Sequence, residues 1–134
     1  MRTWTVIAAI AVSLLIPAPT LAAICFQLSP YDDVVVLEIH GEPAGGFFAL
    51  VGETVGSCGE GTSLPLNGTA HLREDGKAHV GFAVYSATTG CIPFAVQGTL
   101  DPPSFDSGTG FVGNASLGSL AVTFVPATCP TLPQ

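Results

Sequence analysis

The chain has 134 residues, of which residues 1–22 are predicted to be removed, so that one domain's worth of chain is left to fold. It carries 3 Lys+Arg against 10 Asp+Glu, a formal net charge of −7. Binding to phosphates requires Lys and Arg, so the sequence predicts no nucleic-acid partner and no docking on anionic membranes. Charged residues make up 10% of the chain and hydrophobic ones 48%, which excludes a disordered chain.

Residues 1–22 have the three parts of a secretory signal peptide. These are a positive start at Arg2, an apolar run over Val6–Ile16, and small residues before a cleavage site after Ala22. The apolar run is about half as long as the roughly 20 residues that a membrane span needs. We therefore expect a mature domain of residues 23–134, secreted or periplasmic, with no membrane anchor after cleavage.

Four cysteines, Cys25, Cys58, Cys91 and Cys129, lie in the expected mature domain. An even number of cysteines in an oxidising compartment predicts two disulfide bonds, for which three pairings exist. The spacing contains no Cys-x-x-Cys pair, which disfavours a structural zinc site or a redox centre. No cofactor is expected.

Glycine and proline, 16 and 11 residues respectively, punctuate the chain, and short β-rich stretches lie between them. This pattern predicts an all-β domain. A connection is expected over Gly41–Gly46. The expected strands are Ile24–Leu28, Asp33–His40, Phe47–Gly52, Ser63–Leu72, Ala78–Ser86, Ile92–Leu100, Thr109–Asn114 and Leu120–Val125.

The fourth and fifth expected strands form a hairpin whose loop length determines its register. A two-residue turn at Asp75-Gly76 would pair Leu72 with His79 and place each apolar row opposite a polar one. A three-residue loop, Glu74–Gly76, pairs Leu72 with Ala78 and gathers the apolar residues on one face. At its last position this loop needs a residue in the left-handed backbone conformation, and Gly76 stands there. The sequence therefore predicts the three-residue loop.

Eight antiparallel strands predict an up-and-down β-barrel, with a two-sheet β-sandwich as the alternative. If the strands alternate in direction, Cys58 and Cys91 lie at one end, and Cys25 and Cys129 lie beside the seam between the first and last strands. This parity favours the pairs Cys25–Cys129 and Cys58–Cys91. The strand count is similar to that of avidins and lipocalins, but the lipocalin Gly-x-Trp is absent and the single tryptophan, Trp4, lies in the signal. No family is assigned.

The predicted register brings His71 opposite His79 on the polar face of the hairpin. Opposed side chains stand about 5 Å apart, which allows two imidazoles to share a Zn²⁺ or Cu²⁺ ion. The nearest third ligand is Glu74 or Asp75 in the turn. The alternative is a pair of ordinary histidines on a solvated sheet.

The chain contains no Gly-x-Ser-x-Gly, phosphate-binding glycine loop or His-Glu-x-x-His, so no catalytic residue is assigned. The sequence predicts a non-catalytic binding module for a small apolar ligand or a protein partner. The alternatives are a structural or surface protein without a small ligand, and a small hydrolase. Gly68, Gly81, Gly98 and Gly110 either leave space in the barrel or permit bending. An interior pocket above about 300 Å³ would favour ligand binding.

Overall fold

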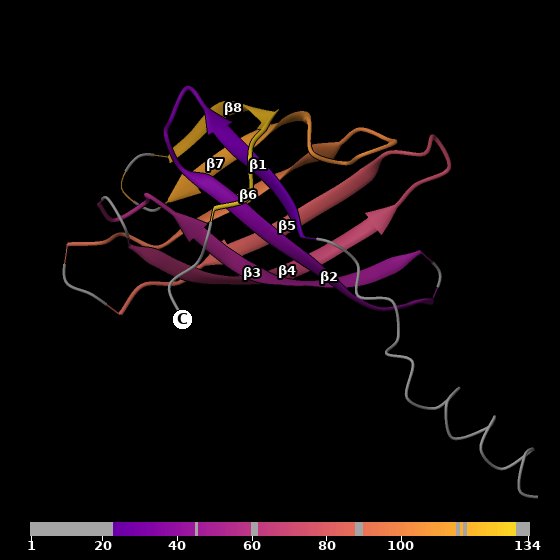
Figure 1. Ribbon diagram of the computed structural model, residues 1–134, viewed down its shortest axis with the longest axis horizontal. Coiled ribbons are helices and arrows are strands. Elements are labelled where there is room, and N and C mark those ends of the chain that lie inside the picture. Colours follow the sequence, from indigo (N-terminus) through magenta and orange to yellow (C-terminus); the bar gives the residue numbers. More distant parts are fainter. Residues whose placement is uncertain are drawn as a thin grey trace, which may run out of the picture.

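The computed structural model describes residues 23–44, 46–59, 62–87, 90–114, 116 and 118–130. The predicted signal peptide, residues 1–22, lies outside the described residues. The described part consists of strands and connections, without a helix (Figure 1). The strands are β1 (Ile24–Ser29), β2 (Val34–Ala44), β3 (Phe47–Val55), β4 (Ser63–Leu72), β5 (Ala78–Val84), β6 (Phe94–Leu100), β7 (Gly108–Asn114) and β8 (Gly118–Pro126).

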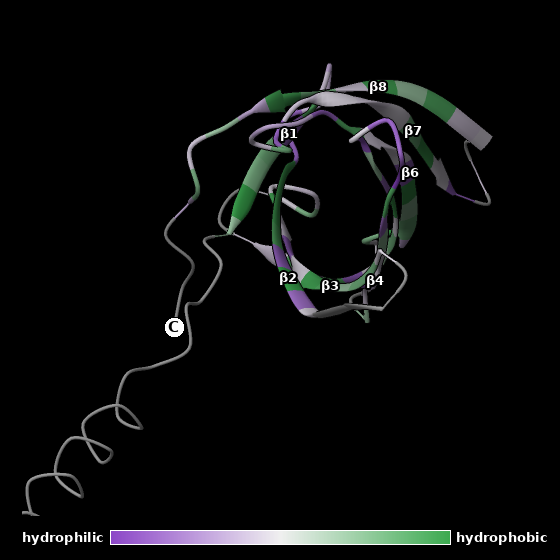
Figure 2. Ribbon diagram, turned by 90° about the vertical axis from the view of Figure 1, so that its right-hand side faces the viewer, coloured by the Kyte–Doolittle hydropathy of each residue, from purple (hydrophilic) through white to green (hydrophobic). Residues whose placement is uncertain are grey.

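The strands form one closed antiparallel barrel. Each strand pairs with the next along the chain, and β8 pairs with β1. Figure 2 looks along the barrel and shows the strands as a ring. The up-and-down barrel is confirmed, and the two-sheet sandwich is excluded. Closure gives every strand two partners, so the sheet has no unpaired edge.

The expected connection over Gly41–Gly46 is wrong, because β2 continues to Ala44. The pairing of β2 with β3 shifts register between His40 and Ala44, and Gly41 has a φ of 93°. A glycine in the left-handed region permits a bulge, so the strand changes register there instead of ending.

The hairpin of β4 and β5 has the predicted register. Leu72 pairs with Ala78, and His71 pairs with His79. Gly76 closes the three-residue loop with a φ of 83°. The odd-numbered positions of both strands therefore face outward and the even-numbered ones face into the barrel.

The interior is packed with large apolar side chains contributed by most strands. At its centre, the rings of Phe26 and Phe124 lie 4.9 Å apart and are tilted by 46°. The buried core consists of Phe26, Leu28, Val35, Leu37, Leu50, Leu64, Leu66, Ala70, Val80, Phe82, Val84, Val96, Leu100, Val122 and Phe124.

Three inward-facing glycines allow this packing. A Cβ atom on Gly98 would lie 2.7 Å from the Phe124 ring, and one on Gly110 would lie 2.6 Å from it. A Cβ atom on Gly68 would lie 2.6 Å from the Cβ atom of Phe82. Such contacts are too close for carbon atoms. Gly98 and Gly110 therefore leave room for the Phe124 ring, and Gly68 allows close approach of the β5 backbone, so none of the three leaves empty space.

Both disulfides are formed. Cys58 is bonded to Cys91 at the end of the barrel where β3 ends and β6 begins, and Cys25 is bonded to Cys129 beside the seam. These are the pairs that strand parity favours. The backbone N–H of Ala127 donates to the Cys25 carbonyl at 3.2 Å, so the chain directly after β8 continues alongside β1.

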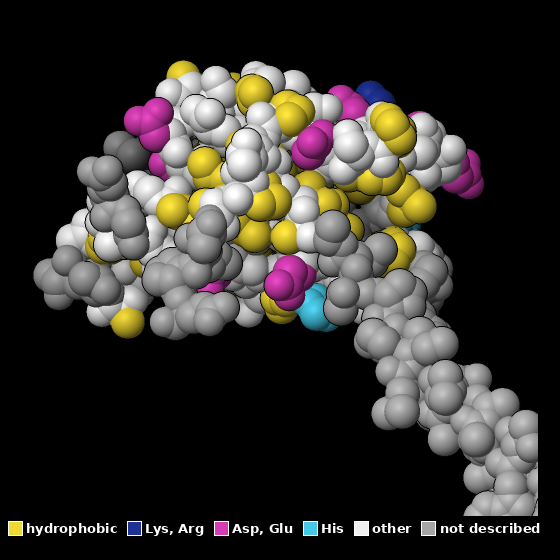
Figure 3. Space-filling model, viewed as in Figure 1, with side chains coloured by type: hydrophobic (Ala, Val, Ile, Leu, Met, Phe, Trp, Pro, Cys, Tyr) yellow, Lys and Arg dark blue, Asp and Glu magenta, His cyan; other side chains and the backbone are white. Residues whose placement is uncertain are grey.

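The outer surface is acidic but not uniformly charged. Figure 3 shows single Asp and Glu side chains around hydrophobic side chains that gather where β1 and β2 cross this face. Within the described residues, no helix is long and apolar enough to cross a membrane.

Candidate functional site: an apolar pocket at one end of the barrel

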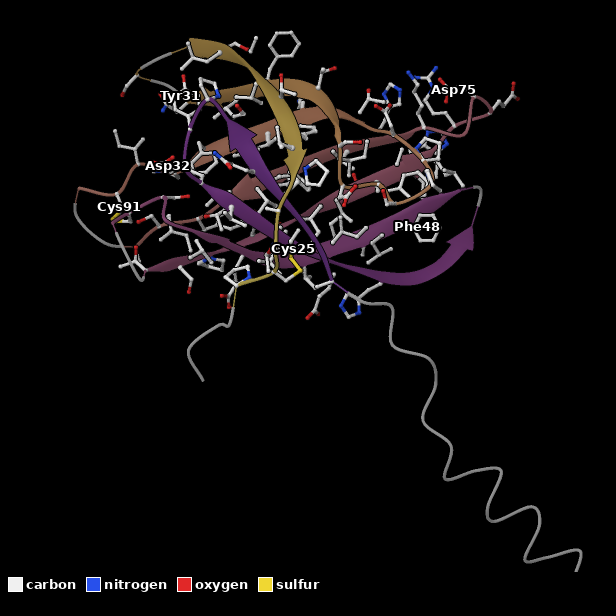
Figure 4. All side chains as sticks on the ribbon, turned by 45° about the horizontal axis from the view of Figure 1, so that its top comes forward. Cys25, Tyr31, Asp32, Phe48, Asp75 and Cys91 are labelled. Atoms are coloured by element: carbon white, nitrogen blue, oxygen red, sulfur yellow. A yellow bond between two sulfur atoms is a disulfide. The ribbon has the colours of Figure 1, made fainter. Side chains whose placement is uncertain are left out.

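The two ends of the barrel carry different connections. The open end carries the β2–β3 hairpin, the β4–β5 turn and the β6–β7 loop. The disulfide end carries the other connections and the Cys58–Cys91 bond. In Figure 4, Phe48 and Asp75 mark the open end, and Tyr31 and Cys91 mark the disulfide end.

An interior pocket of about 290 Å³ lies at the open end. Its described lining is entirely apolar, with no charged side chain and no hydroxyl. The side chains come from the six strands β1 to β6 and from the β6–β7 loop. They belong to Ile24, Leu37, Ile39, Phe48, Leu50, Ala70, Leu72, Ala78, Val80, Leu100 and Phe105.

The pocket exists because two small residues face the interior where β4 ends and β5 begins. Ala70 and Ala78 project into the barrel at neighbouring positions of the hairpin. The rings of Phe48 and Phe105 line the space without filling it. Leu72 at the rim is 43% exposed although it points inward, so the pocket has an apolar entrance.

The β6–β7 loop covers part of this entrance with the Phe105 side chain. Phe105 has a φ of 55°, an unusual value for a bulky residue, and its side chain packs against the core. Its N–H donates to the Asp101 carbonyl at 3.0 Å, and the Asp101 N–H donates to the Ser107 carbonyl at 2.8 Å. Lys77 on the β4–β5 side lies 3.7 Å from the Asp101 carboxylate. The loop is therefore held over the pocket by its own backbone bonds and by one exposed ion pair.

Sequence reasoning missed Phe105 as a site residue. The loop that contains it is rich in proline, serine and aspartate and indicates only a turn. One signal was present, since a lone aromatic residue in a polar loop needs an apolar surface to cover.

The two histidines of the predicted metal site lie on the outer wall, directly opposite each other. The His71 ring is stacked on Phe47, with centroids 4.1 Å apart and planes inclined by 6°. The Asp75 carboxylate accepts a hydrogen bond from the Lys77 N–H at 2.9 Å. Among the described residues, no group of three His, Cys, Asp or Glu side chains is placed to hold a metal ion. The histidine pair by itself is an incomplete ligand set.

A small polar cluster lies at the disulfide end. The Ser57 hydroxyl is hydrogen-bonded to the Asp33 carboxylate at 3.0 Å and to the Thr54 hydroxyl at 2.9 Å. Thr54 is fully buried, so the cluster satisfies a hydroxyl that faces the interior. The cluster contains no imidazole to act as a base for the serine. Its hydrogen bonds link the end of β3 to the start of β2, which is a structural role.

The fold and the pocket define a small disulfide-bonded β-barrel with an apolar chamber at one end. Comparison of the chain with protein-family models, curated proteins and solved structures finds no significant match.

Proposed function

We propose that the protein binds a small, uncharged, apolar ligand in the pocket at the open end. The observation that supports this proposal is an interior space of about 290 Å³ with an entirely apolar lining. Its volume falls just short of the roughly 300 Å³ at which the usual range of ligand pockets begins, so the proposal is carried by the lining and not by the size. An unfilled apolar space forgoes dispersion contacts, and a ligand of matching shape restores them.

The volume limits the size and affinity of the ligand. At roughly 30 Å³ per water-sized group, the pocket takes about ten non-hydrogen atoms. Burying about ten methylene-like groups contributes about 8 kcal/mol before the cost of association. The expected dissociation constant is therefore about 1 µM or weaker.

The lining also limits the chemistry of the ligand. A charged or strongly polar group buried among these side chains would find no partner, which costs several kcal/mol. A bicyclic hydrocarbon or a short alkyl chain meets this requirement. Its orientation would depend on shape alone, since the described lining offers no directional contact.

Naphthalene is a suitable probe, with naphthalene-2-sulfonate as its charged counterpart. We expect naphthalene to shift the methyl resonances of Ala70 and Ala78 in a saturable titration. The sulfonate binds at least tenfold more weakly, because its charge has no partner in the pocket.

Ala78→Phe places a ring in the pocket and is expected to abolish naphthalene binding. Ala95→Phe is the matched control, because Ala95 is an exposed residue on the outer face of β6. Equal binding by both variants would overturn the proposal. So would naphthalene that leaves the methyl resonances of the wild-type protein unmoved.

A further inference from the structure

A second concave surface lies on the outside of the barrel, across β4 to β8, with Ser29 of β1 at its margin. It is an open hollow of about 860 Å³, and the barrel wall separates it from the apolar pocket. One cross-strand row runs through it, in which His79 pairs with Thr99, Thr99 with Thr109 and Thr109 with Thr123. Adjacent strands lie about 4.8 Å apart. Hydroxyl groups therefore recur along the groove at that interval.

Gly81 forms the floor of this groove. It lies between Thr69 and Gln97 on neighbouring strands. A Cβ atom on Gly81 would meet no atom within 4 Å, and the φ angle of Gly81 is not in the left-handed region. Neither crowding nor backbone conformation requires glycine at this position, and a glycine within a strand costs about 0.5–1 kcal/mol. The lack of a side chain at Gly81 therefore serves to leave the groove open.

The groove combines uncharged hydrogen-bonding groups with an exposed aromatic ring. Phe111 is 57% exposed and stands between Gln97 and Ala121 in the next row. None of the described lining residues is Lys, Arg, Asp or Glu. The face in Figure 3, by contrast, carries several acidic side chains.

These features exclude several classes of ligand. A phosphate or carboxylate ligand needs a cationic side chain, and a metal ion needs carboxylates or a larger imidazole set. An extended peptide that adds a strand needs a free sheet edge, which the closed barrel lacks. A neutral sugar chain has hydroxyls for the threonine row and apolar ring faces for an aromatic side chain.

We propose that this groove binds a neutral linear oligosaccharide, with one sugar ring stacked on Phe111 and hydroxyls bonded to Gln97, Thr99 and Thr109. At roughly 30 Å³ per water-sized group the groove accommodates about thirty non-hydrogen atoms, or two to three hexose units. The proposal is independent of the apolar pocket.

The test is calorimetric titration with neutral tetrasaccharides of glucose, mannose, xylose and N-acetylglucosamine, alongside tetragalacturonate as the charged control. We expect saturable binding of at least one neutral tetrasaccharide and no binding of tetragalacturonate. Failure of every neutral tetrasaccharide to bind would overturn the proposal, as would equal binding of the charged one.

Gly81→Val fills the floor, and Phe111→Ala removes the exposed ring. Each is expected to weaken oligosaccharide binding at least tenfold. Gly113→Val is the matched control, because Gly113 also faces outward from a strand and an added Cβ would lie 3.4 Å from its nearest neighbour, the Gly118 carbonyl oxygen. Circular dichroism verifies that all three variants fold.

Unchanged affinity in both groove variants would overturn the assignment of the groove. Self-association of the wild-type protein that Gly81→Val abolishes would also overturn it, in favour of a second copy of the chain. Ala78→Phe, inside the barrel, is expected to leave oligosaccharide binding unchanged.

Discussion

The packed centre of the barrel and the pocket at its open end belong to the same closed sheet, and both have small residues facing the interior. They differ in whether a large side chain fills the space beside those small residues. In the centre, the ring of Phe124 occupies the space beside Gly98 and Gly110. At the open end, Ala70 and Ala78 face the interior, and about 290 Å³ stays unfilled. Small residues therefore create a cavity only where no large side chain from another strand reaches them.

The disulfide end gives a second contrast with the open end. Its concavity is about 150 Å³ and includes Asp33 in its lining. The apolar pocket at the open end has about twice that volume, and its described lining residues are all apolar. Of the two ends, the open one is therefore the end suited to an apolar ligand.

The largest expected effect comes from removing a ring at the centre. Phe124→Ala is expected to lower the free energy of unfolding by about 3–5 kcal/mol, because it leaves a cavity among buried side chains. Phe105→Ala is expected to cost less than half as much, since Phe105 borders a space that is already unfilled. Urea denaturation measures both. Equal losses would remove the contrast between centre and pocket.

Removing a disulfide has the next largest effect and separates stability from binding. Cys58→Ser with Cys91→Ser is expected to cost about 2–4 kcal/mol. Loss of the Cys25–Cys129 bond, which spans 104 residues against 33, is expected to cost about 1 kcal/mol more by loop-closure entropy. Naphthalene binding to the folded Cys58→Ser/Cys91→Ser protein is expected to stay unchanged, because the Cys58–Cys91 bond lies at the end of the barrel opposite the pocket. A parallel loss of binding would show that the two ends are coupled.

Adding carbon atoms to a small residue is expected to lower stability in the packed centre and to raise it at the pocket. Gly98→Ala forces a Cβ atom to 2.7 Å from the Phe124 ring and is expected to cost about 1–3 kcal/mol. Ala78→Leu fills part of the pocket and is expected to raise stability by up to about 1 kcal/mol. Thermal denaturation shows whether each variant is more or less stable than the wild-type protein. A stabilising Gly98→Ala would show that the centre is not tightly packed.

The smallest expected effect concerns the outer wall beside the open end. Zn²⁺ is expected to shift the imidazole resonances of His71 and His79 together but weakly, since two imidazoles make an incomplete shell. At a metal concentration equal to the dissociation constant, the stabilisation is about 0.4 kcal/mol. His79→Ala should abolish the shift at His71. Resonances that stay unmoved in wild-type protein would remove the metal site and leave the barrel unaffected.

Much of the fold was predictable because its determinants are local. Alternation along β4 and β5 places the apolar side chains on one face, and only the three-residue loop keeps that face continuous. The bulge after His40 was not predictable, because a run of glycine and proline indicates a connection equally well.

The pocket was not predictable for a different reason. Which side chains face inward follows from the two-residue period of a strand, so the sequence by itself determined that Ala70 and Ala78 point into the barrel. Whether a distant side chain fills the space beside them depends on strand tilt and on where the loops lie, and only the tertiary structure decided that. Phe124 of β8 meets Gly110 of the neighbouring strand β7 and Gly98 of the following strand β6, whereas Phe105 lines the pocket from the β6–β7 loop. Packing is a contact between residues far apart in the chain, and no local pattern encodes it.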